Sequence, residues 1–332
     1  MSDKLTIKDI AKLSGTSKTT VSFYLNGKTE KMSLSTQERI REVIEKTNYE
    51  PNVIARSLNA KSIQLIGVII GDITNSFANQ IVKGIDNVAK EKNYQLIIGN
   101  SNYDFQMERK YIERMMAMGV DGFIVQPTIQ FELVEKELLN RNKPIVYIDS
   151  QSRNSKGLWV KTNNYEAVLE ATESIIQKGY ENFIMITADP SVLTTRMERA
   201  RGYEDALKIK NHQVKTMIVN SDTTSDEIKS FVHNSLTDKK TCIFVPNCWV
   251  LPKVFVAIKD YRDLMPDKLG LMGFDNLEWT EFSYPTISTI VQPAYDEGKT
   301  AARILIDRIE GINEEAPNQI LKCKTNFCES IK

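Results

Sequence analysis

Histidine, cysteine and cofactor motifs are scarce in this chain of 332 residues. It contains two histidines, His212 and His233, neither of them in an H-x-x-x-H pattern, and its four cysteines include no C-x-x-C pair. No glycine-rich dinucleotide or phosphate motif follows an apolar run. We therefore expect no metal site and no cofactor, and the sequence disfavours an enzyme that depends on hydrolytic or general-base chemistry.

Long hydrophobic runs are also missing. No stretch of about 18 apolar residues exists, which argues against a transmembrane helix. The first residues, Met1 to Lys4, lack the apolar segment of a secretory signal peptide, so we expect a cytoplasmic protein with reduced cysteines. The length predicts two or three domains, and 41% hydrophobic with 26% charged residues is typical of globular proteins.

The net charge is zero, but the charges are unevenly distributed. Residues 1–61 contain 11 Lys and Arg against 7 Asp and Glu, whereas the remainder contains 32 against 36. A small basic segment on a slightly acidic body is typical of a DNA-binding head attached to a ligand-binding body. A difference of a few charges also arises by chance, so this signal counts only together with motifs.

The first 50 residues predict three short helices. Thr6 to Asp9 has the pattern of a capping box, Ser17 precedes a second helical pattern, and Ser35-x-x-Glu38 predicts the start of a third helix. Gly15 permits an abrupt turn between the first two helices, which is the arrangement of a helix-turn-helix. A three-helix bundle that binds no nucleic acid fits the same pattern.

From Ile63 onward, apolar runs alternate with amphipathic helical patterns. Such alternation is typical of parallel sheets covered by helices, with ligands at the carboxyl ends of the strands. Eight strands suit two smaller sheets better than one, which predicts two subdomains with a hinged cleft between them. The predicted strands are Ile66–Ile70, Gln95–Ile98, Gly122–Val125, Ile145–Ile148, Phe183–Ile186, Met217–Val219, Cys242–Val245 and Leu269–Met272.

Five motifs stand out in order along nearly the whole chain: TIKDIA from Thr6, SKTTVS from Ser17, the segment from Asn48 to Leu58, DITNSF from Asp72 and GFDN from Gly273. Together they resemble the LacI/GalR family of bacterial regulators. The resemblance implies an α/β protein with a helix-turn-helix head (1–50), a hinge helix and linker (51–62) and a body (63–332) like a periplasmic binding protein. Two doubly wound parallel-sheet subdomains would form the body, an N-subdomain at about 63–161 and 293–319 and a C-subdomain at about 162–292 and 320–332.

The resemblance further implies that a homodimer binds double-stranded, pseudo-palindromic operator DNA. Phe23 stands where many relatives have arginine, so the operator should differ at one base pair, unless Phe23 packs within the head. Leu58 corresponds to the side chain that wedges between base steps in the minor groove. The residues expected to contact DNA are Thr6, Lys18, Thr19, Thr20, Ser22, Phe23, Asn26, Asn52, Ala55 and Leu58.

An effector site in the cleft is the second implication of the resemblance. Arg199, Asn247 and Asp275 match positions that hold ligand hydroxyls, and Trp249 lies beside Cys248 where the family often has a carboxylate. Arg199 and Asp275 could instead form an ion pair at the surface or between the subdomains. Further candidates at strand ends are Asn75, Phe77, Gln126, Asp149 and Gln292.

The chemistry of these residues predicts a sugar effector, with a sugar acid as the next choice. A carboxylate accepts hydrogen bonds from two vicinal hydroxyls, and a guanidinium can clamp a carboxylate. Nucleobases are less favoured because only Phe77 and Trp249 offer aromatic faces. The SKTTVSFYLNGK stretch and the segment Gly273–Trp279 also resemble the 2-keto-3-deoxygluconate regulators of the family.

Two other classes of protein share the fold expected for the body. The basic segment 1–61 and the missing signal peptide disfavour a solute-binding protein, and the missing nucleophile elbow disfavours an enzyme. We therefore expect a transcriptional regulator. Repression of carbohydrate-utilisation genes is favoured over activation, because a dimer on a palindrome most simply blocks polymerase.

Overall fold

The computed structural model describes residues 5–25, 27–49, 62–150, 157–275, 277–312 and 317–332. The chain divides into two compact units, Met1–Ile63 and Gln64–Lys332, which we call the head and the body. Each unit has its own hydrophobic core.

The described residues of the head form three α-helices, as predicted: α1 (Ile7–Leu13), α2 (Lys18–Leu25) and α3 (Leu34–Thr47). One buried side chain from each helix, Ile10, Val21 and Ile40, meets in a small core that Tyr24 and Val43 help to cover. Gly15 has a φ of +61° in the turn between α1 and α2, a conformation that costs glycine little. The helix-turn-helix arrangement predicted from the sequence is therefore confirmed.

Side-chain caps fix where the head helices begin. The Ser17 hydroxyl accepts a hydrogen bond from the Thr20 backbone N–H at 3.0 Å, as expected of the residue before α2. The third helix begins earlier than predicted, because the Ser33 hydroxyl accepts from the Thr36 N–H at 3.3 Å. Ser35 is therefore inside the helix, and its prediction as the cap was wrong.

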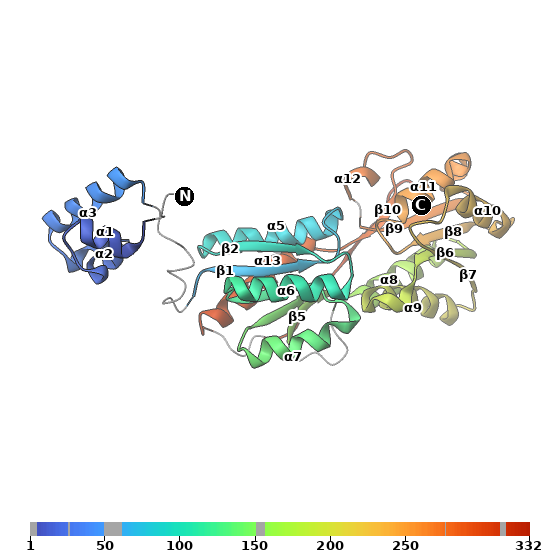
Figure 1. Ribbon diagram of the computed structural model, residues 1–332. Coiled ribbons are helices and arrows are strands. Elements are labelled where there is room, and N and C mark those ends of the chain that lie inside the picture. Colours follow the sequence, from blue (N-terminus) through green and yellow to red (C-terminus); the bar gives the residue numbers. More distant parts are fainter. Residues whose placement is uncertain (1–4, 26, 50–61, 151–156, 276, 313–316) are drawn as a thin grey trace. The chain divides into compact units, whose positions relative to one another are not determined.

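The body contains two six-stranded sheets (Figure 1). The first has the order β11-β5-β4-β3-β1-β2 and is parallel throughout; the second has the order β12-β10-β9-β8-β6-β7 and is parallel except for β12. The strands of the first sheet are β1 (Leu65–Ile70), β2 (Gln95–Asn100), β3 (Gly122–Val125), β4 (Ile145–Ile148), β5 (Leu158–Thr162) and β11 (Gln319–Leu321). Those of the second are β6 (Asn182–Ala188), β7 (Val214–Val219), β8 (Thr241–Val245), β9 (Leu269–Phe274), β10 (Ser288–Val291) and β12 (Lys324–Asn326).

Helices cover both faces of each sheet, so each subdomain has three layers (Figure 1). On the first sheet, α5 (Ser76–Glu91) and α13 (Ala294–Ile309) cover one face, and α6 (Phe105–Met118) and α7 (Glu132–Asn140) cover the other. On the second, α8 (Asn164–Gln177) and α9 (Thr194–Ile209) lie opposite α10 (Ser225–Ser235) and α11 (Leu251–Ala257). A short helix, α12 (Leu277–Thr280), follows β9. The predicted fold class, with two doubly wound sheets in the body, is confirmed.

The chain passes between the two sheets after β5, after β10 and between β11 and β12. The Thr162 hydroxyl donates a hydrogen bond to Gln292 Oε1 at 2.6 Å, which joins the first two crossings. The Cys323 N–H donates to Asn163 Oδ1 at 2.7 Å, which joins the first and third crossings. Side chains therefore tie the three crossing segments together.

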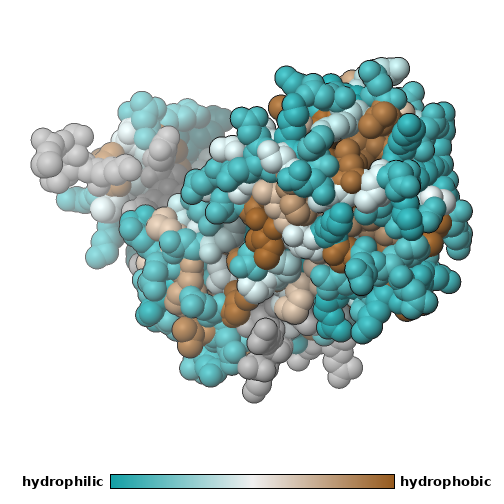
Figure 2. Space-filling view, turned by 90° about the vertical axis from the view of Figure 1, so that its right-hand side faces the viewer, coloured by the Kyte–Doolittle hydropathy of each residue, from teal (hydrophilic) through white to brown (hydrophobic). Residues whose placement is uncertain are grey.

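Polar side chains predominate on the face shown in Figure 2, where hydrophobic residues form several separate groups. Among the helices of the described residues, none is long and apolar enough to span a membrane.

Candidate functional site

Three of the six predicted DNA contacts that the structure describes are exposed. Lys18 and Thr19 are exposed in the first turn of α2, and Ser22 and Phe23 are half-buried one turn later. Before α1, the exposed Thr6 hydroxyl donates to Asp9 Oδ2 at 2.6 Å. The first two positions of α2 can therefore reach a partner without any change in the head core.

Two of the predicted contacts on α2, Thr20 and Phe23, also interact within the head itself. The Thr20 hydroxyl hydrogen-bonds the Ser17 hydroxyl at 2.8 Å, and Lys31 Nζ lies 4.8 Å from the centre of the Phe23 ring. Phe23 is thus half-buried and has a neighbouring cation over its ring. Four further predicted DNA contacts, Asn26, Asn52, Ala55 and Leu58, lie outside the described residues.

A small polar cavity, which we call the inner cavity, lies among strand ends of both sheets. Its volume is about 50 Å³, and all nine residues predicted to bind the effector line it. They are Asn75, Phe77, Gln126, Asp149, Arg199, Asn247, Trp249, Asp275 and Gln292. Parallel strands bring their carboxyl ends to one edge of a sheet, which explains how residues so distant in the sequence gather here.

Two amide side chains occupy equivalent places in the two sheets. Gln126 follows β3 and Asn247 comes two residues after β8, and each of these strands is third from the edge strand, β2 or β7. Gln126 Oε1 accepts from the Gly71 N–H at 2.8 Å, and its Nε2 donates to Asp149 Oδ2 at 2.7 Å. Asn247 Oδ1 accepts from the Ala188 N–H at 2.8 Å and from the Thr187 hydroxyl at 3.0 Å. These bonds fix the cavity wall, so both amides are held in one orientation before any ligand binds.

Asp275 is held rigidly at the end of β9. It has a φ of +59°, uncommon for a residue with a side chain, and its carboxylate accepts from Gln292 through the backbone N–H at 3.0 Å and through Nε2 at 2.7 Å. Burial raises the pKa of Asp275 to about 6, against the opposing effect of the Arg199 charge. The two parallel bonds orient the carboxylate at the cavity wall.

Asp149 occupies the corresponding position after β4, with a φ of +61°. Its backbone N–H donates to Oε1 of the fully buried Glu297 on α13. Within the described structure, Asp149 Oδ1 and Glu297 Oε2 are buried without a hydrogen-bond partner. Burial raises the pKa of both carboxyls, and the charge of Asp149 raises that of Glu297 further. This acid pair therefore retains a proton more readily than exposed carboxyls do.

Arg199 is buried and already has protein partners. Its Nε donates to Asn164 Oδ1 at 2.7 Å, its Nη1 donates to the Pro246 carbonyl at 3.0 Å, and the guanidinium lies 3.7 Å from the centre of the Phe274 ring. The ion pair with Asp275, considered above as an alternative, is not formed among the described residues. Arg199 acts on the buried acids through its charge and fixes the cavity wall.

Five further residues line the inner cavity and were not predicted: Tyr103, Leu193, Thr195, Arg196 and Cys248. Thr195 and Arg196 precede Arg199 by four and three positions in α9, so helical spacing could have identified both. Tyr103 comes from a loop in which Asn102 and Tyr103 both have positive φ, and no local sequence pattern indicates its direction.

Replacing Asp275 with asparagine is expected to flatten the pH dependence of stability. Folding raises the pKa of Asp275 from 3.8 to about 6, so the folded state binds the proton more tightly than the unfolded chain. The wild-type protein should therefore lose stability from this group as the pH rises from about 4 to 6, and the variant should not. Between pH 4.5 and 7, the difference in free energy of unfolding between the two proteins should change by on the order of 2 kcal/mol in urea titrations. Parallel pH profiles would contradict this assignment.

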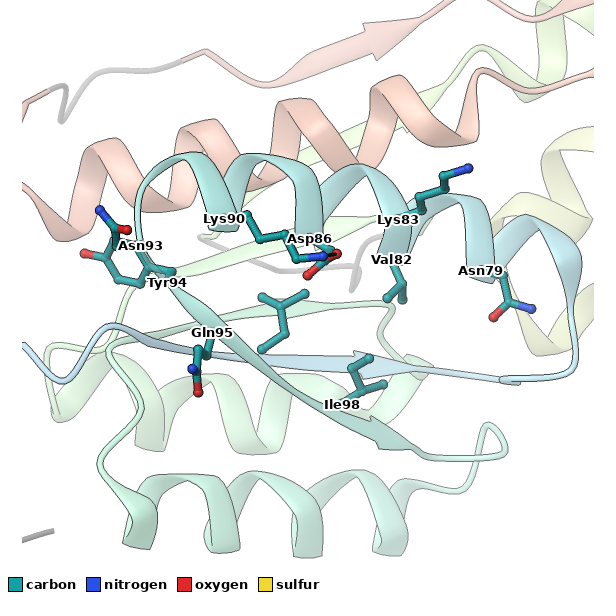
Figure 3. Close-up of a pocket in the computed structure, with 10 residues that line it drawn as sticks. Asn79, Val82, Lys83, Asp86, Lys90, Asn93, Tyr94, Gln95 and Ile98 are labelled. Atoms are coloured by element: carbon teal, nitrogen blue, oxygen red, sulfur yellow. Dashed lines mark hydrogen bonds and ion pairs between the residues drawn. The ribbon is translucent and has the colours of Figure 1, made fainter. Parts of the chain in front are cut away.

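A separate, wider hollow lies along the outer side of α5 and β2 (Figure 3). Its volume is about 830 Å³, and we call it the edge groove. β2 is the edge strand of the first sheet, and Ile98 on it is 41% exposed. Figure 3 shows Val82 and Asp86 of α5 on the side of the helix that faces this strand. None of the residues predicted to bind DNA or effector lines the edge groove.

Both parts of the chain match known families. Residues 6–52 match the family described as bacterial regulatory proteins, lacI family, and residues 66–313 match the periplasmic binding protein domain. The HTH-type transcriptional regulator KdgR of Bacillus subtilis (strain 168) is 30% identical in an alignment of 334 positions, which covers 98% of this chain and 97% of the relative.

Two solved structures are similar in fold. The lac repressor dimer bound to operator and the anti-inducer ONPF has a TM-score of 0.82 at 19% identity and covers 99% of each chain. A LacI family transcriptional regulator from Enterococcus faecium with bound ribose has a TM-score of 0.70 at 19% identity and covers 80% of this chain and 98% of its own. The helix-turn-helix head, the two sheets of the body and the full-length match to KdgR agree. The chain belongs to the LacI family of bacterial regulatory proteins and is a DNA-binding transcriptional regulator.

Proposed function

We propose that the protein is a repressor of carbohydrate-utilisation genes, controlled by a sugar or sugar-acid effector that binds in the inner cavity. One observation carries this proposal: side chains from strand ends of both sheets converge on one polar cavity with buried acids, amides and two arginines. Carboxylates and amides are the groups that hydrogen-bond hydroxyl-rich ligands. The ribose bound to the Enterococcus faecium regulator supports the same class of ligand here.

Binding of a sugar would couple the cavity to the arrangement of the subdomains. The inner cavity, at about 50 Å³, is far smaller than the about 300 Å³ at the lower end of ligand sites. A sugar therefore requires the walls to move apart, and the two walls belong to different sheets. The crossings at Thr162, Gln292 and Cys323 are the segments about which such a movement would take place.

The head would bind pseudo-palindromic operator DNA as part of a homodimer in the cytoplasm, where chromosomal DNA is found. Two-fold symmetry of a helix-turn-helix dimer matches the two half-sites of such an operator. On the body, the edge groove offers an open strand edge with the exposed Ile98, a surface that a second copy could cover. The dimer bound to operator in the lac repressor structure supports this assembly.

Replacing Lys18 with alanine is expected to reduce operator affinity by about 10- to 150-fold, the effect of losing one charged contact worth about 1.5–3 kcal/mol. Lys18 is exposed in the first turn of α2, where it can reach a guanine edge or a phosphate. Fluorescence anisotropy with labelled operator measures the change. The control is Lys46→Ala, an exposed lysine near the end of α3 that pairs with Glu42 at 3.2 Å. Equal losses for the two variants would contradict the proposed role of α2.

The proposed function as a whole is tested by selecting genomic fragments that bind the protein and footprinting them. A palindromic footprint whose occupancy changes with one class of sugar or sugar acid is the expected result. Binding without sequence preference, or a specific footprint that responds to purines and to no sugar, would contradict the proposal.

A further inference from the structure

One cation of the inner cavity makes neither a hydrogen bond nor an ion pair with any residue that the structure describes. Arg196 lies in the first turn of α9, is half-buried and lines the inner cavity. Among the described residues it forms no hydrogen bond and no ion pair, and its guanidinium is 6.0 Å from the centre of the Tyr103 ring. Burial lowers the pKa of Arg196, as expected for a cation partly removed from water, although the charges of Tyr103 and Asp149 oppose this effect.

The second arginine of the cavity differs in this respect. Arg199 donates to Asn164 and Pro246 and stacks on Phe274, so two of its nitrogens are already used. Arg196 keeps its whole planar fork of donors for a ligand, and this fork matches the two oxygens of a carboxylate. This difference predicts that Arg199 holds the wall of the inner cavity in place and that Arg196 contacts the ligand.

The acceptors of the cavity complement this cation. Asp149 Oδ1 is buried without a partner in the described structure, and Asp275 is oriented by Gln292 at the wall. Both carboxylates suit hydroxyl groups, whereas neither can neutralise an anionic ligand group. In the described structure, the cavity thus offers acceptors for hydroxyls and one cation without a hydrogen bond, a combination that suits a polyhydroxy carboxylate.

Arg196 also lies where the ligand would enter. A second hollow of about 600 Å³, which we call the outer cavity, shares Tyr103, Arg196 and Trp249 with the inner cavity. These three residues therefore form the boundary between the two spaces. A carboxylate bound at this boundary would remain partly hydrated, which lowers the cost of removing its charge from water.

We propose that the effector is a sugar acid whose carboxylate is bound by Arg196, while its hydroxyls face Asp149 and Asp275. This inference rests on the proposed function, and it selects one of the two ligand classes that the function leaves open. It makes Arg196 the residue that distinguishes an acid from the corresponding neutral sugar.

Calorimetric titration with matched pairs of ligands tests the inference. Each pair differs in a carboxylate against a CH₂OH group: D-galacturonate with D-galactose, D-glucuronate with D-glucose, and D-gluconate with D-glucitol; 2-keto-3-deoxygluconate is titrated as well. At least one acid should bind, with any neutral counterpart at least tenfold weaker. In Arg196→Gln, the affinity for that acid should fall by about 10- to 150-fold, the effect of losing a charge-assisted hydrogen bond. Arg196→Lys keeps the charge without the fork and should fall between the two.

The matched control is Arg201→Gln, an exposed arginine on the same helix, which should bind the acid as the wild-type protein does. Thermal unfolding should be nearly unchanged in Arg196→Gln, because Arg196 makes no hydrogen bond with the residues that the structure describes. Binding of a neutral sugar without its acid would overturn the inference but keep the proposed function. Unchanged acid binding in Arg196→Gln would overturn the role of this residue. Failure of every sugar and acid to bind would contradict both the inference and the sugar-controlled function.

Discussion

Replacing Arg199 with methionine is expected to lower the free energy of unfolding of the body by about 3–5 kcal/mol, the cost of leaving buried charges without compensation. Methionine preserves much of the stem volume but removes the charge and the bonds to Asn164 and Pro246. The Arg199 charge opposes the effect of burial on Asp149 and Asp275. Without it, Asp275 would keep only neutral hydrogen-bond partners, and Asp149 would keep only the smaller effect of the Arg196 charge. A residue that served the ligand alone would leave stability unchanged.

The pH dependence of this loss identifies its cause. Without Arg199, the pKa values of the two acids rise further above their values in the unfolded chain, so the folded state binds protons more tightly than the unfolded state does. Stability of the variant should therefore decrease more steeply than that of the wild-type protein as the pH rises from about 5 to 8. Urea unfolding followed by circular dichroism measures both effects, with Arg201→Met on the exposed face of α9 as the control. A loss that does not vary with pH would indicate damaged packing rather than uncompensated charge.

The sequence was sufficient to predict the class of fold because the buried strands are apolar runs that can be recognised without knowledge of their neighbours. All eight predicted strands are present in the two sheets. The four strands that were not predicted are β5, β10, β11 and β12. Two of them, β11 and β12, have only three residues each, with half-buried or exposed side chains, so neither alternation nor an apolar run distinguishes them from loops. Their pairing depends on where the crossings bring the chain, a tertiary effect.

The candidate site was predictable where residues follow strands directly. Asp275 directly follows β9, and Asn247 comes two residues after the end of β8. The family resemblance indicated the same two positions. Glu297 could not be found in this way. It lies in an amphipathic helix at a position that a local pattern would read as polar and exposed, yet it is fully buried beside Asp149. Its burial depends on how closely α13 packs against its neighbours, and no short segment encodes that distance.

The close packing of α13 against α5 rests on two glycines, one in each helix. A Cβ added at Gly298 would lie 2.0 Å from the Ile81 carbonyl oxygen, and one added at Gly84 would lie 2.1 Å from the Tyr295 carbonyl oxygen. Both obstacles are backbone atoms of a helix, which cannot rotate away as a side chain can. The two helices must therefore separate if either glycine is replaced.

Replacing Gly298 with alanine is accordingly expected to destabilise the body by about 2–3 kcal/mol, although alanine favours a helix by about 1 kcal/mol over glycine. Separation of the helices should also displace the adjacent Glu297 from the Asp149 N–H, so effector affinity should fall with stability. Urea unfolding and ligand titration of the same preparation measure the two losses, and Gly84→Ala should reproduce both from the opposite helix. Arg303→Ala, at an exposed position of α13, is the control and should change neither quantity appreciably. A Gly298→Ala protein that is more stable than the wild type would mean that helix propensity outweighs the close contact.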